Sequence, residues 1–177
     1  MLWLRNSLSR SSGTRRAAIR GLFVLVLASA GLTAVAEQPE QEAKEGYAVI
    51  VSPDVEVDGM TFDELHQIFT LEKQFWGAGR RVKLLLSERD LEPGSFLLAR
   101  IYRSDYAGLR RLILGKLYQG EIEQPPMVAA NGSTVAYVSH GSGVIAVVPA
   151  KELDRKEIKV ISIDGKLPGA DGYPLAR

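Results

Sequence analysis

Hydrophobic positions along the chain fall into short continuous runs that alternate with stretches of helical spacing. Four runs rich in Val, Ile and Leu predict buried strands, over residues 47–51, 82–86, 144–148 and 158–163.

The stretches between these runs predict helices. Thr61 is placed as a helix N-cap, and Glu64, three residues later, completes a capping box. Apolar residues then recur at helical spacing through Phe69, and a second helical stretch is expected around Leu97, Ile101 and Tyr102.

Two further helices are predicted in the second half of the chain. One carries Leu109, Leu112, Ile113 and Leu117 at i, i+3, i+4 and i+8, which predicts a face packed on the core. The other is a short helix over 133–139, which the following glycines end. Strands that alternate with helices predict an α/β sandwich, with a small mixed sheet flanked by helices.

The first 36 residues differ from the rest of the chain. They contain five of the 22 basic residues and none of the 21 acidic ones, and an apolar run beginning at Gly21 ends in Ala34-Val35-Ala36. A basic segment, an apolar segment and a small-x-small site together predict a cleaved signal peptide over 1–36, hence a bacterial periplasmic or secreted protein. The alternative is an uncleaved membrane anchor. Residues 37–46 are polar and acidic and predict a flexible leader before a single domain at 47–177.

Composition excludes several functional classes. Beyond residue 36 the net charge is about −4, which argues against a nucleic-acid binder. Without cysteine there is no disulfide, thiolate metal site or cysteine nucleophile, and two histidines, His66 and His140, do not predict a metal site. No nucleophile–base pair and no spaced pair of carboxylates is found, so we expect neither catalysis nor a cofactor.

Two segments of the chain carry a resemblance to the phosphate-type periplasmic binding proteins. Residues 58–69 (DGMTFDELHQIF) resemble a helix-opening segment of that family, in which a basic residue and a tryptophan follow, as Lys73 and Trp76 do here. The end of the chain is the more specific match. There 163–168 (IDGKLP) and 172–177 (GYPLAR) resemble the family's "IDG…P…YPL-small-R" segment.

Two further pieces follow the family order, and the resemblance spans residues 47–177. They are Gly120 ahead of Pro125-Pro126, and 141–145 (GSGVI) at the start of a strand. A full member of that family has two lobes that close on the ligand. The resemblance implies that this chain keeps essentially one periplasmic-binding-protein-like lobe, the inserted one, without the hinge closure that gives affinity.

The resemblance also implies a candidate site for an oxyanion such as phosphate. The family's loop has an Arg, then three residues, then Ser-Gly-Thr at a helix N-terminus, where backbone N–H groups, hydroxyls and the guanidinium meet the anion. At the same position Arg89 and Gly94 match and Ser95 stands for the threonine. With Ser87 at the strand end, the candidate ligand-binding residues are Ser87, Arg89, Gly94 and Ser95.

A helix start that no longer binds anything is the competing interpretation of this loop. Pro93 replaces the family's serine and removes one hydroxyl and one N–H donor. Glu88, Asp90 and Glu92 add negative charge that opposes an anion.

Two functions therefore remain open from the sequence. The first is an exported module that binds phosphate or a similar oxyanion weakly, or did so ancestrally. The second is a non-catalytic envelope scaffold that docks on a partner protein, or on a second copy, through the face that the missing lobe would cover. Contact with a membrane is expected only through an uncleaved signal.

Overall fold

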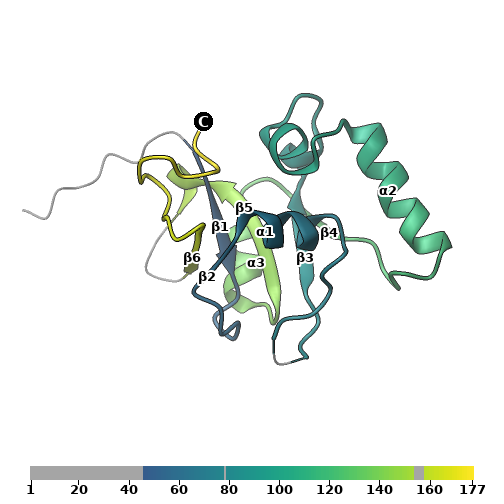
Figure 1. Cartoon of the computed structure of the whole chain (residues 1–177), viewed down its shortest axis with the longest axis horizontal. Coiled ribbons are helices and arrows are strands. Elements are labelled where there is room, and N and C mark those ends of the chain that lie inside the picture. Colours follow the sequence, from purple (N-terminus) through teal and green to yellow (C-terminus); the bar gives the residue numbers. More distant parts are fainter. Residues whose placement is uncertain (1–45, 78, 154–157) are drawn as a thin grey trace, which may run out of the picture. The chain divides into compact units, whose positions relative to one another are not determined.

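Strand β1 (Tyr47–Val51) lies inside a six-stranded sheet whose strand order is β2-β6-β1-β5-β3-β4 (Figure 1). The structure is a computed structural model that describes residues 46–77, 79–153 and 158–177, all within one unit that spans 39–177. The predicted signal peptide over 1–36, and the leader up to residue 45, lie outside the described residues.

The sheet is mixed because β1 runs against both of its neighbours. It pairs antiparallel with β5 and β6, whereas β3 pairs parallel with β4 and β5, and β2 pairs parallel with β6. The remaining strands are β2 (Gly59–Met60), β3 (Lys83–Ser87), β4 (Met127–Ala129), β5 (Val144–Pro149) and β6 (Lys159–Ile163). The predicted α/β class, with a small mixed sheet flanked by helices, is confirmed.

Hydrophobic side chains cover both faces of the sheet, which explains why its central strands are apolar throughout. Because successive residues of a strand point to opposite faces, Val49 and Val51 join one core and Ile50 joins the other. The first core also contains residues of helix α1 (Phe62–Phe69) and the π-helical turn η2 (Leu98–Tyr102). The second core contains Val138 of helix α3 (Thr134–His140).

Helix α1 begins as the sequence predicts. The Thr61 hydroxyl accepts a hydrogen bond from the Glu64 backbone N–H, and the Glu64 carboxylate accepts one from the Thr61 N–H, each at 3.1 Å. A third acceptor comes from the far end of the chain, since the Asp164 carboxylate accepts from the Phe62 N–H at 3.0 Å. These acceptors satisfy N–H groups that have no partner within the helix.

Helix α2 (Tyr106–Tyr118) is more exposed than its spacing predicts. Leu109 is its one fully buried residue, while Leu112 and Ile113 are partly buried against the first core. Leu114 and Tyr118 are 41% and 90% exposed. The prediction of a helix with one face packed on the core is confirmed, although most of that face is only partly buried, because the helix lies beside the sheet rather than over it (Figure 1).

The C-terminal segment closes the first core. Tyr173 and Leu175 are buried, and the Leu175 carbonyl accepts a hydrogen bond from the Tyr47 N–H at 3.0 Å. The last residues therefore cover the start of the central strand. Among the described residues no helix is both long and apolar enough to cross a membrane.

Candidate oxyanion loop at the carboxyl edge of the sheet

Three parallel strands, β3, β4 and β5, end at the same edge of the sheet. Their last residues are Ser87, Ala129 and Pro149. From β3 the chain continues to the neighbour on one side, β4, whereas from β5 it crosses β1 to reach β6 on the other side. The gap between β3 and β5 is therefore a topological switch point, which is where open α/β sheets bind ligands.

The candidate loop begins with a short 3₁₀ helix, η1 (Glu88–Leu91), directly after β3. Ser87 caps it: its hydroxyl accepts from the Arg89 N–H at 3.3 Å, and the Asp90 carboxylate accepts from the Ser87 N–H at 2.7 Å. Gly94 then has a φ of +76°, a conformation that glycine adopts readily, where the chain turns into the next helical stretch.

Asn131 connects this loop to the end of β4. Its side-chain oxygen accepts from the Ser87 hydroxyl at 2.8 Å and from the Arg89 backbone N–H at 3.0 Å. A hydroxyl and a backbone N–H are the kinds of donor that an oxyanion would use. The Asn131 oxygen therefore holds the Ser87 hydroxyl, which the sequence assigns to a ligand, together with the Arg89 backbone N–H.

Glu152 engages the cation of the loop. It lies in the 3₁₀ turn η3 (Ala150–Glu152) after β5, and its carboxylate accepts from the Arg89 guanidinium at 2.7 Å. This bond and the charge of Glu152 raise the pKa of Arg89, so the side chain stays protonated. The two side chains are 40% and 31% exposed, which leaves the pair within reach of solvent and of a competing anion.

Asp90 is the one buried carboxylate of the loop, with 5% of its surface exposed. Burial raises its pKa to about 6, and the Ser87 N–H and the charge of Arg89 offset this only in part. Near neutral pH Asp90 therefore carries a negative charge close to Arg89.

The structure brings Ser87 and Arg89 together at the switch point and places Ser95 behind them. The Ser95 hydroxyl donates to the Asp90 carbonyl at 2.7 Å and accepts from the Leu98 N–H at 3.3 Å, so it holds the loop in shape. Sequence reasoning missed Asn131 and Glu152. Each follows the end of a strand, as Arg89 does, but β4 has only three residues and shows no recognisable pattern.

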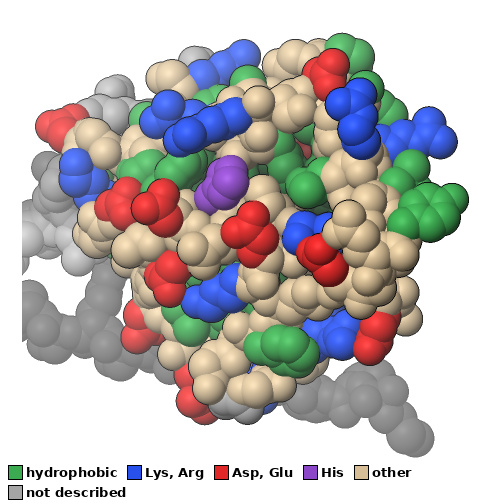
Figure 2. All heavy atoms as spheres, turned by 45° about the vertical axis from the view of Figure 1, so that its right-hand side comes forward, with side chains coloured by type: hydrophobic (Ala, Val, Ile, Leu, Met, Phe, Trp, Pro, Cys, Tyr) green, Lys and Arg blue, Asp and Glu red, His purple; other side chains and the backbone are tan. Residues whose placement is uncertain are grey.

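Charges of both signs are interspersed on the molecular face shown in Figure 2, with hydrophobic side chains between them. That face shows no broad positive surface for steering an anion. Among the described residues, no three His, Asp or Glu side chains gather as a metal site would require.

Comparison with known proteins finds similarity to solved structures only, since no family model and no curated protein matches. An ABC-type phosphate transport receptor from Vibrio cholerae is 17% identical with a TM-score of 0.47, over 71% of this chain and 49% of that one. A putative phosphate ABC transporter substrate-binding protein with bound phosphate from Clostridium perfringens is 14% identical with a TM-score of 0.48, over 71% and 48%.

A third similar structure is PstS from Borrelia burgdorferi, at 20% identity with a TM-score of 0.49, over 71% of this chain and 50% of that one. The chain thus spans about half the length of each of these proteins.

Proposed function

We propose that the protein is an exported module of one binding-protein-like lobe, and that it binds phosphate or a similar small oxyanion weakly at the loop 87–95. The observation that carries this proposal is the position of Arg89 at the switch point between β3 and β5. Ser87 and Ser95 would supply hydroxyls, and Gly94 and Ser95 backbone amides, once the loop opens around the anion.

Weak binding follows from how the donors are used in the absence of a ligand. Glu152 and Asn131 hold Arg89 and Ser87, so an anion has to replace bonds that already exist. Exchanging one set of hydrogen bonds for another returns little net free energy. Glu88 and Glu92 also repel an anion, and we therefore expect a Kd of about 1 mM or weaker, equivalent to about −4 kcal/mol.

Titration with inorganic phosphate, followed by amide chemical shifts or calorimetry, tests the site. We expect shifts centred on residues 87–95 and 131, and their loss in Arg89→Ala with the fold intact. Arg110→Ala is the matched control, since Arg110 is an exposed arginine on α2 and outside the loop. Micromolar affinity, or equal binding by Arg89→Ala, would contradict this placement.

Export is a separate part of the proposal. Signal cleavage after Ala36 would make Glu37 the first residue of the protein recovered from the periplasm or the medium. Mass spectrometry of that fraction measures this directly. Recovery of the chain with its N-terminal segment intact in the membrane fraction would support the anchor instead.

Docking to an envelope partner or to a second copy is the alternative function, and exposed residues of α2 favour it. Tyr106, Leu114 and Tyr118 are 46%, 41% and 90% exposed on a helix that buries only Leu109 completely. Exposed apolar side chains on one element are typical of contact surfaces. Sedimentation of the protein and of Leu114→Glu tests self-association, and a concentration-independent monomer in both would argue against it.

A further inference from the structure

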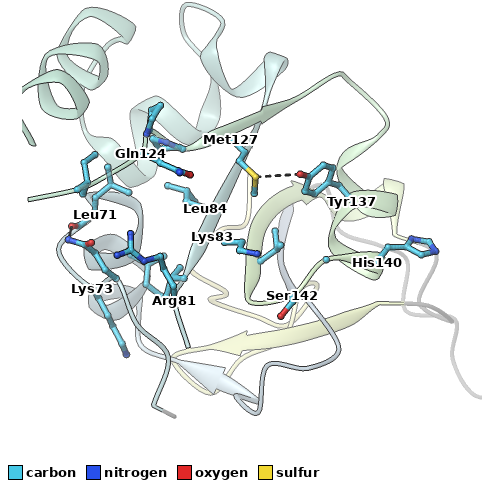
Figure 3. A pocket seen from close by; sticks show the side chains of 18 of the residues that line it. Leu71, Lys73, Arg81, Lys83, Leu84, Gln124, Met127, Tyr137, His140 and Ser142 are labelled. Carbon is cyan, nitrogen blue, oxygen red and sulfur yellow. Dashed lines mark hydrogen bonds between the residues drawn. The ribbon is translucent and has the colours of Figure 1, made fainter. Parts of the chain in front are cut away.

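An open cleft of about 920 Å³ lies at the other edge of the sheet, where the parallel strands begin (Figure 3). Lys83, Met127 and Val144, the first residues of β3, β4 and β5, all line it. None of the four candidate oxyanion residues does. The volume is within the range of small-molecule sites, and the cleft is separate from the loop described above.

The walls of this cleft are largely hydrophobic. They include Leu71, Pro125 and Pro126 as well as Met127 and Tyr137. Tyr137 is 50% exposed, and its hydroxyl is bonded to the Met127 sulfur at 3.5 Å, a weak acceptor (Figure 3). A ligand with an apolar body would cover these side chains, and removing them from water favours binding.

The charged side chains that line the cleft, Lys73, Arg81 and Lys83, are all positive, and the His140 imidazole lines it as well. The first two are balanced locally, because Lys73 pairs with Glu64 at 3.0 Å and Arg81 pairs with Glu123 at 3.2 Å. Neither carboxylate lines the cleft.

Lys83 is left as the uncompensated positive charge. It is exposed at the start of β3, and within residues 46–77, 79–153 and 158–177 no carboxylate pairs with it. Figure 3 places its side chain between Arg81 on one side and Tyr137 on the other. One unpaired ammonium beside an apolar wall fits a ligand with one negative charge and a hydrophobic body.

We infer that this cleft binds a small organic monoanion, with its acidic group at Lys83 and its apolar body against Met127 and Tyr137. Inorganic phosphate does not fit this description, because it has no apolar part to cover the walls. The inference stands independently of the proposed oxyanion loop, since it uses different residues at the opposite edge of the sheet.

The test is a fluorescence titration of the purified protein with 8-anilinonaphthalene-1-sulfonate, a monoanion with an aromatic body. We expect saturable binding that Lys83→Gln weakens by about fivefold or more, as loss of a charge-assisted contact should. Lys151→Gln is the matched control, because it removes another exposed lysine, which lies at the other edge of the sheet. Thermal unfolding of each variant checks that the fold is unchanged.

Two further arms separate the sites and the chemistry. 3-Phenylpropionate should displace the probe, whereas inorganic phosphate at the same ionic strength should not. The Tyr137→Ala variant should bind the probe more weakly than the parent, without a shift in its unfolding temperature. The inference is overturned if the probe does not bind the folded protein. The inference is also overturned if the Lys83→Gln variant binds the probe as tightly as the parent does, or if Lys151→Gln weakens probe binding as much as Lys83→Gln does.

Discussion

Arg89 and Glu152 join the ends of two neighbouring strands through a 2.7 Å ion pair that spans the switch point of the sheet. The carboxylate oxygen occupies a position that an oxyanion would need if it bound the same guanidinium. Arg89 is thus held in place by a group of the same chemistry as the proposed ligand. Removing the Glu152 carboxylate should change the affinity for an oxyanion and leave the fold intact.

The first prediction concerns Glu152→Gln. Glutamine keeps the size of the side chain but removes its charge, so Arg89 loses its ionic partner and one competitor of an anion disappears. We expect phosphate to bind this variant about two- to fivefold more tightly than it binds the parent, measured by calorimetry or chemical shifts. Because the pair is partly exposed, the gain cannot be larger than an exposed ion pair contributes.

Glu123→Gln is the control for this measurement. It removes the carboxylate partner of Arg81, which lies at the opposite edge of the sheet. Phosphate affinity should stay within experimental error of the parent. If both substitutions strengthen binding equally, the effect comes from net charge and not from the release of Arg89.

The longer elements of the fold could be predicted from the sequence because their signals are local. The continuous apolar run of β1 and the capping box at Thr61 depend on neighbours within a few residues, and both are confirmed. Strands β2 and β4 have two and three residues, too few to show a period, and pairing with distant strands alone makes them part of the sheet. The exposure of α2 was missed because spacing shows which residues share a face, not what covers it.

The candidate site was predictable as a place but not as a set of contacts. The resemblance located Arg89 after a strand, and the structure confirms that it follows β3. Asn131 and Glu152 lie 42 and 63 residues away along the chain, and only the order of the strands brings them to Arg89. The cleft at the other edge arises in the same way, since its lining comes from segments between residues 68 and 144.

The second prediction contrasts two substitutions in the hydrophobic residues. Ile145 in β5 is fully buried in the first core, so Ile145→Ala should lower the free energy of unfolding by about 2–5 kcal/mol. Leu112 is only partly buried on α2, so Leu112→Ala should cost about 1 kcal/mol. Denaturant unfolding with equal m-values measures both. Equal losses would show that Leu112 is packed as tightly as a residue of the core.

The third prediction tests the start of α1. Thr61→Ala removes the acceptor for the Glu64 N–H, and should lower the free energy of unfolding by about 1 kcal/mol. Thr61→Ser retains the hydroxyl and should behave like the parent, which separates the hydrogen bond from general effects of substitution. Because Thr61 is exposed, lost packing cannot explain a difference between the two variants.

The fourth prediction concerns the pH dependence of stability and rests on Asp90. Burial raises its pKa from 3.8 to about 6, so between these values the folded protein holds a proton that the unfolded chain has released. Unfolding then releases the proton, and the free energy of unfolding falls as pH rises from about 4 to about 6, then levels off. Two carboxylates act in the opposite sense, since hydrogen bonds from Ser142 to Asp54 and from Thr61 to Glu64 lower the pKa of each acid. Their stabilisation is lost as pH falls through the carboxylate range.

Asp90→Asn isolates the contribution of the buried acid from that background. The carboxamide oxygen can still accept from the Ser87 N–H, but it cannot take up a proton. We expect the decline in stability between pH 4 and 6 to disappear in this variant. The free energy of unfolding of the variant minus that of the parent should therefore be larger at pH 7 than at pH 4, by up to about 3 kcal/mol. Urea unfolding at half-unit steps of pH measures the difference directly. Parallel curves for the two proteins would mean that Asp90 titrates in the folded state as it does in the unfolded chain, and that water reaches the carboxylate beneath the Ser87–Arg89 turn.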